Sequence, residues 1–481
     1  NQALAQALPS FNFPRPATSD GTDAIRPATL RGLAPDQVLV LVNGKRRQAS
    51  ALVNVNGTVG RGSAAVDMNT LPTAAIGAIE VLRDGASAQY GSDAIAGVIN
   101  VRLREASEGG NVTLTFGQRD TFVETSPAAP PTGATWTVQP NRSTTDGETL
   151  TLSAWAGYDL FGDGFVTVSG DIQERENTVR AAPDTRRQFN LIGTAFDPRE
   201  TTINRLNQWN GDPELSQLTL FVNAGYNLGV STELYGCAST QTRDARSPGF
   251  YRRATDDRNL PSIYPEGFLP FIQTDTTDRS AAGGIRSTLG GWDVDTSLVW
   301  GASRIEFNIQ NTLNVSIGPS SQRAFYAGAL EYGQTVLNVA AVRGFDVGLA
   351  SPLNVAMGIE GRVEAYKIEA GELNSYRNGG QPNQFGGIAA VGSQVFPGFQ
   401  PANATDVDRN AIGAYIDLEA NLTDRLLLSG ALRAENYSDF GSAVTGKIAG
   451  RYDFNDAFAL RGAVSTGCRS PTLHQTNFTS T

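Results

Sequence analysis

Few side chains in this 481-residue sequence have the types and spacing that catalysis or metal binding requires. The only histidine, His474, is near the end of the chain, which excludes a site built from several histidines and favours a solvated loop residue. The cysteines, Cys237 and Cys468, are far apart and lack metal-ligand spacing, so we expect unpaired packing residues. No G-x-S-x-G motif is present, and the glycine-rich stretch 57–62 lacks the Lys-Ser/Thr end of a phosphate-binding loop. The sequence therefore predicts that the protein is not an enzyme, and it indicates no metal site and no cofactor.

Side chains suited to recognising a small molecule are gathered in three polar stretches. The first is a loop expected at 48–66, the second is an aromatic stretch around 250–268 with two arginines, and the third lies around 376–384. Aromatic rings, amides and guanidinium groups suit either sugars or anionic chelates. Loop packing and solvation are the alternative explanation for any one of these residues. The candidate ligand contacts are Asn54, Asn56, Thr58, Arg61, Tyr251, Arg252, Tyr376 and Arg377.

The overall composition narrows the class of protein only partly. The net charge is −10 and the basic residues form no long run, so nucleic-acid binding has little support. The mean hydropathy is −0.23, and no apolar run approaches the ~18 residues that a membrane-spanning helix needs. A transmembrane β-barrel is compatible with these values, because its strands alternate lipid-facing and lumen-facing residues.

From residue 110 onward, apolar and polar residues alternate with a period of two. For example, Val166 and Val168 alternate with Thr167 and Ser169. Similar patterns occur at 149–158, 218–226, 414–420 and 426–433. A period of two gives each strand one apolar and one polar face. The polar face meets bulk water in a soluble sandwich and the lumen in a membrane barrel, and we count about 13 candidate strands.

The lengths of the connections distinguish between these two folds. Short turns are expected at 161–164, 228–231, 289–292, 421–425 and 453–456. Long connections are expected near 119–147, 178–215, 242–279, 308–332 and 366–408, with one short exception on that side at 438–442. This alternation is typical of an up-and-down barrel with tight turns on one side of the membrane and long loops on the other. Aromatic residues beside the short turns would form an interfacial belt, namely Tyr158, Tyr226, Trp292 and Tyr452.

The strand count also predicts that the barrel is incomplete. An antiparallel bacterial barrel needs an even number of strands to close, so we expect residues 106–481 to be the N-terminal part of a transmembrane barrel truncated here. The largest plugged barrels have about 22 strands, which would leave about nine strands absent.

Residues 1–105 differ from the rest and predict a compact α+β domain, incomplete at its N-terminus. Asn43-Gly44 follows an apolar, β-branched run and is a strong signal for a tight turn. The expected elements are a short helix at 1–8, a strand at 38–42, a helix at 71–79 leading into a strand at 79–82, and a last strand at 97–103.

Several segments of the chain resemble the TonB-dependent outer-membrane receptors. Residues 79–101 (IEVLRDGASAQYGSDAIAGVINV) resemble the signature of the family's plug domain, and 38–44 (VLVLVNG) and Arg31-Gly32 resemble other plug elements. Residues 436–441 (NYSDFG) and 466–471 (TGCRSP) resemble segments of the family's barrel. The resemblance covers the plug almost completely and the barrel in patches.

The sequence departs from the family pattern at a few positions. Asp84-Gly85 stands where Gly-Pro is usual, and Cys468 stands where an aromatic residue is common. The energy-coupling box that precedes the plug in this family and the final strand ending in an aromatic residue are not found, so we expect the sequence alone to be unable to couple or assemble.

The resemblance implies a mainly β protein in the outer membrane of a Gram-negative bacterium, with the plug domain in the lumen of a transmembrane antiparallel barrel. It implies energy-coupled uptake of a scarce small-molecule ligand, with outer-membrane lipid and the TonB–ExbB–ExbD complex as partners and an accessory lipoprotein as a further candidate partner. The expected ligand is an iron–siderophore complex, and an oligosaccharide or other organic nutrient is the alternative. Alternatives from other classes are a passive porin or adhesion barrel and a soluble β-rich binding protein.

The resemblance also implies ion pairs that lock the plug to the barrel, formed by Arg31 and Arg83. A guanidinium can bind a carboxylate with two parallel hydrogen bonds in a polar lumen. The candidate partners face inward by strand parity, and they are Asp171, Asp417, Glu419 and Glu435. The alternative is a set of surface ion pairs worth under ~1 kcal/mol each.

Overall fold

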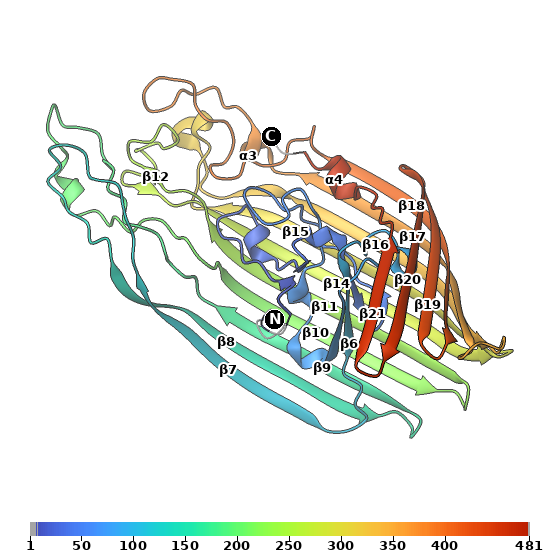
Figure 1. The fold of residues 1–481 in the computed structure, drawn as a ribbon. Coiled ribbons are helices and arrows are strands. Elements are labelled where there is room, and N and C mark those ends of the chain that lie inside the picture. Colours follow the sequence, from blue (N-terminus) through green and yellow to red (C-terminus); the bar gives the residue numbers. More distant parts are fainter. Residues whose placement is uncertain (1–5, 7, 480–481) are drawn as a thin grey trace.

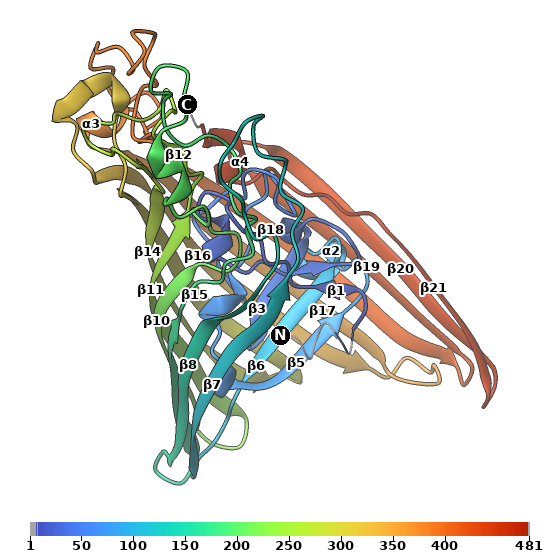
Figure 2. The ribbon, with the colours of Figure 1, turned by 90° about the vertical axis from the view of Figure 1, so that its left-hand side faces the viewer.

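A curved antiparallel sheet of 13 strands surrounds a small N-terminal domain on its concave side (Figures 1 and 2). This computed structural model describes residue 6 and residues 8–479. The helix expected at 1–8 lies almost entirely outside the described residues. Among the described residues, no helix is both long enough and apolar enough to cross a membrane.

The strands of the large sheet follow one another in chain order, each antiparallel to the next, and confirm the expected count of 13. They are β7 (Gly110–Val123), β8 (Arg142–Asp159), β9 (Gly164–Arg175), β10 (Glu214–Asn227), β11 (Thr232–Pro248), β14 (Phe271–Leu289), β15 (Trp292–Gln310), β16 (Phe325–Phe345), β17 (Leu353–Ala370), β18 (Thr405–Thr423), β19 (Leu426–Tyr437), β20 (Gly441–Asn455) and β21 (Phe458–Ser465). Short turns and long loops alternate along this series as predicted. The edge strands are β7 and β21 in the described part of the chain, and the 22-strand total stays a prediction.

The two faces of the sheet have the polarity of a membrane barrel. Large apolar side chains on the outer face are exposed, for example Leu150 (47%) and Leu432 (54%). Polar side chains on the concave face are buried, for example Thr219 (0%) and Asn223 (5%). A soluble sandwich would bury the apolar face instead, so this arrangement supports a wall whose outer side contacts lipid.

The N-terminal domain is built on a four-stranded sheet in the order β4-β3-β6-β5. Its strands are β3 (Val38–Val42), β4 (Lys45–Arg46), β5 (Ile76–Leu82) and β6 (Gly97–Leu103), with a separate pair β1 (Phe11–Asn12) and β2 (Thr29–Leu30). Asn43 and Gly44 both have positive φ, 49° and 76°, and form the expected tight turn between β3 and β4.

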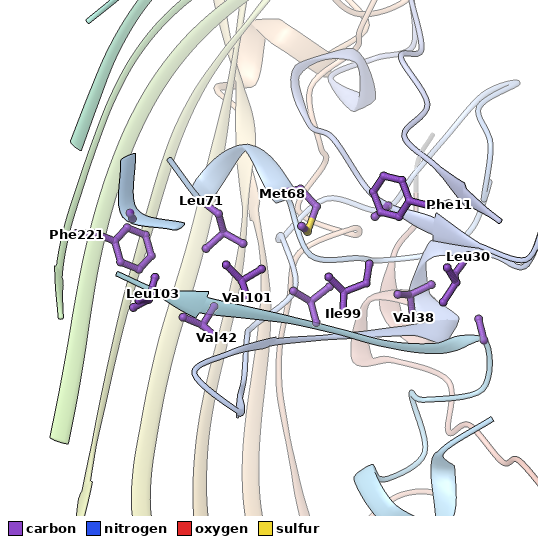
Figure 3. Close-up of a cluster of buried hydrophobic side chains, with 14 residues drawn as sticks. Phe11, Leu30, Val38, Val42, Met68, Leu71, Ile99, Val101, Leu103 and Phe221 are labelled. Carbon is purple, nitrogen blue, oxygen red and sulfur yellow. The ribbon is translucent and has the colours of Figure 1, made fainter. Parts of the chain in front are cut away.

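The core of this domain is completed by the barrel wall (Figure 3). Val38, Ile99 and Val101 of the small sheet pack with Met68 in one buried cluster. Phe221 of β10 joins the same cluster from the concave face of the large sheet and is itself 2% exposed. The two domains therefore share one hydrophobic cluster.

The remaining elements are short. The helices are η1 (Thr22–Ala24), η2 (Pro35–Gln37), η3 (Met68–Thr70), η4 (Thr73–Ala75), α2 (Ser87–Tyr90), η5 (Pro198–Thr201), η6 (Val315–Ser320), α3 (Leu373–Tyr376) and α4 (Leu473–Asn477). A two-stranded ribbon, β12 (Arg252–Arg253) with β13 (Gly267–Phe268), lies in the loop between β11 and β14.

The prediction of a helix at 71–79 is wrong. Only the single turn η4 forms, and β5 begins at Ile76, three residues earlier than expected. Ile76 pairs with Leu103 of β6, so the backbone obtains its hydrogen bonds from the sheet. The β-branched residues Ile76, Ile79 and Val81 pack against the domain core, which favours a strand over a helix.

We predict that Gly97→Ala severely destabilises the N-terminal domain. Gly97 has a φ of +144°, and a Cβ there would lie 2.1 Å from the carbonyl oxygen of Leu82 and 2.7 Å from Leu30. Strain at such a position combined with a backbone clash should cost about 3 kcal/mol or more in the free energy of unfolding. The loss of stability is measured by unfolding the domain in denaturant, with protease sensitivity as the signal of unfolding. Gly57→Ala is the control, because a Cβ there meets nothing within 4 Å, and equal stability of the two variants would contradict the prediction.

Candidate functional site

The interface between the N-terminal domain and the concave face of the sheet contains buried charges. Nη1 of Arg243 on β11 lies 2.6 Å from Oδ2 of Asp67 in the N-terminal domain, and these side chains are 0% and 4% exposed. The Nε and Nη2 groups of Arg243 donate to the side chains of Gln217 and Gln241, at 2.8 Å each. Arg243 is therefore fully paired and hydrogen-bonded, which a buried charge requires.

Two further ion pairs reach the wall from the segment that follows the β3–β4 turn. Nζ of Lys45 lies 2.9 Å from Oδ1 of Asp295 on β15. Nη2 of Arg47 lies 2.6 Å from Oδ1 of Asp278 on β14, and Nε2 of Gln48 donates to the same oxygen at 3.0 Å. A short basic segment thus attaches the N-terminal domain to two neighbouring strands.

Asp93 lies at the centre of a third group of contacts, among three arginines. It is ion-paired with Arg46 of β4. Nη1 of Arg362 on β17 and Nε of Arg469 lie 3.8 Å and 3.7 Å from its carboxylate. Burial alone would raise the pKa of Asp93, but the charges of Arg46, Arg469 and Arg362 lower the pKa to about 2. Asp93 is therefore ionised at neutral pH and attracts both the wall and the C-terminal segment of the chain.

The two arginines predicted to form the lock lie elsewhere on the interface. Nη1 of Arg31 lies 4.0 Å from Oδ1 of Asp84 within the N-terminal domain. Oδ2 of Asp84 lies 3.6 Å from Nζ of Lys447 on β20, so Asp84 links Arg31 to the wall. Arg83 is exposed and makes no ion pair among the described residues.

The predicted carboxylate partners have other neighbours. Asp417 accepts a hydrogen bond from Nε2 of Gln89 in α2 at 2.6 Å, Glu435 accepts one from Nε of Arg433 at 2.9 Å, and Glu419 is exposed. The structure does not bring Arg31 or Arg83 to any of the three. Strand parity predicts the face on which a carboxylate lies, but it does not predict which residue of the N-terminal domain lies at the same level along the lumen.

The sequence analysis does not select the residues that form the ion pairs across the interface. None of Lys45, Arg47, Asp67 and Asp93 is among the predicted lock residues. The signal in the sequence is a run of three basic residues directly after a fully apolar strand and a tight turn.

The candidate ligand contacts in the first loop serve partly to hold that loop. Asn54 is buried and donates to Oγ of Ser63 at 3.1 Å. Asn56 donates to Asp20 at 2.6 Å, and Thr58 donates to the carbonyl oxygen of Val55 at 2.8 Å. Arg61 and Asn56 are both exposed, and Arg61 is the one of these two without a hydrogen bond described above.

The other four candidates lie in two loops that touch each other. Tyr251 and Arg252 are half-buried in the loop between β11 and β14, and the hydroxyl of Tyr251 donates to the carbonyl oxygen of Glu266 at 2.8 Å. Tyr376 is half-buried and Arg377 exposed, next to each other in the loop between β17 and β18. Nε2 of Gln384 in the second loop donates to the carbonyl oxygen of Ala254 in the first, at 2.9 Å. The structure brings these two pairs into one loop cluster, and their ligand role stays a prediction.

The expectation that His474 is a solvated loop residue is wrong. His474 is 0% exposed, and its ring packs between Tyr332 and Tyr366, with centroid distances of 4.5 Å to each. Burial lowers the pKa of His474 to about 3, so the ring is neutral at physiological pH. The cysteines are free, as expected.

Comparison with known proteins assigns the two domains to one family. The family model described as "TonB-dependent Receptor Plug Domain" matches residues 1–98. The model described as "TonB dependent receptor-like, beta-barrel" matches residues 239–481. The chain belongs to the TonB-dependent receptors. Its N-terminal domain is the plug of that family, and the 13-stranded sheet is part of the barrel wall.

Individual proteins that resemble the chain support this family, and the sequence identities over most of the chain are low. The chain is 21% identical over 488 aligned residues to the ferric enterobactin receptor PirA of Pseudomonas aeruginosa, covering 98% of this chain and 57% of the relative. It is 37% identical over 93 residues to the vitamin B12 transporter BtuB of Vibrio cholerae, covering 19% and 13%. The crystal structure of the siderophore receptor PirA from Acinetobacter baumannii has a TM-score of 0.62 at 15% identity, covering 97% of this chain and 59% of that one. The chain thus spans less than two thirds of these relatives.

We predict that Asp67→Asn loosens the plug by leaving the guanidinium of Arg243 without its counter-charge. Removing one partner of a buried ion pair typically costs about 3–5 kcal/mol. The matched control is Asp84→Asn, because Asp84 is 49% exposed and its ion-pair distances are 3.6 and 4.0 Å. Denaturant-induced release of the plug, measured by protease access, should shift strongly for the first variant and little for the second. Equal shifts would contradict a buried lock.

We predict that His474 makes the stability of the folded protein depend on pH. Its pKa is lower in the folded state, about 3, than the ordinary 6.5, so its contribution is complete above about pH 6.5 and is lost as the pH falls toward 3. His474→Phe keeps a ring between the two tyrosines without a titrating group. The free energy of unfolding of this variant should change less with pH than that of the natural protein between pH 6.5 and 4. An unchanged pH dependence would exclude His474 as its source.

Proposed function

We propose that this protein is an outer-membrane receptor of a Gram-negative bacterium that imports a scarce small molecule, with energy supplied by the TonB–ExbB–ExbD complex. The ligand we propose is an iron–siderophore complex. The observation that carries the proposal is a plug held in the lumen by paired charges, such as Asp67 with Arg243 and Arg47 with Asp278.

A polar interface suits a plug that must move during transport. Ion pairs and hydrogen bonds can be exchanged for bonds to water as the plug leaves the wall, whereas a large apolar interface would expose hydrophobic surface. The contacts across Asp84 to Arg31 and Lys447 are weak enough to separate first. In this way Arg31 would still contribute to the lock predicted from the family.

The ligand class has support from the relatives and from the outer loops. Two relatives that extend along almost the whole chain are a ferric enterobactin receptor and a siderophore receptor. Anionic ferric chelates suit exposed arginines and aromatic rings. Arg377 is exposed next to Tyr376 in the chain, and Arg61 is exposed in the first candidate loop. A vitamin B12 transporter matches over 93 residues of the chain, so an oligosaccharide or other organic nutrient is the second candidate.

Growth of a deletion strain tests the proposal most directly. We predict that loss of the gene reduces growth under iron limitation with a siderophore as the iron source, and that deletion of TonB has the same effect. Growth on single carbon sources should be unaffected. A defect on one carbon source with normal growth under iron limitation would replace the siderophore by an organic nutrient.

Two outcomes would contradict import by an energy-coupled receptor. Absence of any nutrient phenotype would contradict import itself. Uptake that continues without TonB would favour a passive porin, and the purified natural full-length protein would then conduct ions in planar bilayers without added denaturant.

A further inference from the structure

The outward face of β15 has an apolar stretch whose length fits the thickness of a membrane. Outward side chains are mainly apolar from Trp292 to Ala302, and charged or amide side chains follow from Arg304 onward. The ten residue steps between Trp292 and Ala302, at ~3.3 Å per residue and a strand tilt of ~40°, span about 25 Å of membrane height. The apolar band of outer-membrane barrels has about the same height, ~25 Å. Trp292 therefore marks the limit of the band on the side of the short turns, which is the periplasmic side of such barrels.

Arg343 interrupts the apolar outward face at this limit. Asp293 of β15 pairs with Val342 of β16, so the next residues along the two strands, Trp292 and Arg343, lie opposite each other. On the other side, Arg343 pairs with Val355 of β17. A cation thus stands between two apolar side chains on the face that contacts lipid.

The guanidinium group of Arg343 is held in place by the protein itself. Its Nη1 donates to the carbonyl oxygen of Gly290, in the turn between β14 and β15, at 3.0 Å. Its Cζ lies 5.0 Å from the centroid of the Phe345 ring, and that ring packs edge-on against Trp292 at a centroid distance of 5.6 Å. A Cβ on Gly291 would lie 3.3 Å from the same Cζ, so the glycine leaves room for the guanidinium. This group is therefore preorganised and has little conformational entropy to lose on binding a ligand.

Most hydrogen-bond donors of Arg343 are free. A guanidinium has about five N–H donors, and the bond to the turn uses one of them. The part of the chain that the structure describes offers this group no other hydrogen bond and no ion pair. Two carboxylates close to it in register or sequence have other partners, since Asp293 accepts a hydrogen bond from Thr288 at 2.7 Å and Asp346 accepts one from a backbone N–H of its own turn at 3.3 Å.

A planar, fixed guanidinium with free donors suits a phosphate group, which it can bind with two parallel hydrogen bonds. The periplasmic leaflet of an outer membrane consists of phospholipids, and their phosphates lie just beyond the apolar band. We infer that Arg343 binds the phosphate of one phospholipid of this leaflet. The acyl chains lie further up the wall, over the exposed pair Leu298 and Leu337. The inference rests on the outer-membrane placement of the proposed function, and it does not depend on which ligand is imported.

Native mass spectrometry of the natural full-length protein, released from detergent with added lipid, tests this site. The probes are phosphatidylglycerol and diacylglycerol, which has the same acyl chains without the phosphate. We expect one phosphatidylglycerol to be retained, with binding weaker by about tenfold or more to Arg343→Gln, because hydrogen bonds to a charged group are lost. Phe345→Leu keeps the charge and removes the ring beneath it, so binding should weaken by about two- to fivefold. The matched control is Arg425→Gln, because Arg425 is an exposed arginine in the turn between β18 and β19, and its loss should leave binding unchanged.

Three results would overturn the inference. Equal retention of diacylglycerol would show that the phosphate is not recognised. An equal loss of lipid in Arg425→Gln would show that any cation on the turn side attracts phospholipid. Unchanged binding to Arg343→Gln would exclude this arginine directly. Because lipid retention does not require import, absence of a nutrient phenotype would contradict the proposed function and leave this site standing.

Discussion

The pairing of charges between the plug and the lumen wall is the constraint on which the rest of the structure depends. The concave face of the sheet buries groups such as Arg243 and Asp278, which would be costly without partners. Asp67 and Arg47 of the plug supply those partners. The wall can therefore bury these charges because a domain with complementary charges fills it, and the plug keeps its position because the wall offers those charges at fixed heights.

The surroundings of the wall change along its strands. From Trp292 to Ala302 of β15 the outer face is mainly apolar and suits lipid, while the inner face is polar and meets the plug. From Arg304 onward the outer face carries charges, and the inner face becomes apolar, with Phe307 packed against Phe396 of an outer loop at a ring distance of 4.9 Å. The strands thus behave as a membrane barrel along one part of their length and as a soluble protein along the other.

The function proposed for this chain follows from contacts that differ in strength. The pair of Asp67 with Arg243 is buried, whereas Asp84 contacts Lys447 and Arg31 at longer distances and is half-exposed. A graded set of polar contacts allows a pulling force to separate the domains stepwise, while burial of Phe221 in the plug core opposes spontaneous release. A receptor that must stay closed at rest needs both kinds of contact.

The sequence by itself determined the elements whose signals are local. The period of two gave 13 strands, the alternation of turns and loops gave the up-and-down order, and Asn43-Gly44 gave the hairpin of the plug, because each depends on neighbours along the chain. Only the tertiary structure decided that residues 76–79 extend β5, that His474 is enclosed by two tyrosines, and that Asp67 and Asp93, not Asp417 or Glu419, meet the arginines of the interface. These outcomes depend on which residues of two domains reach the same height in the lumen, and that height is set by strand tilt and plug position, which no local pattern encodes.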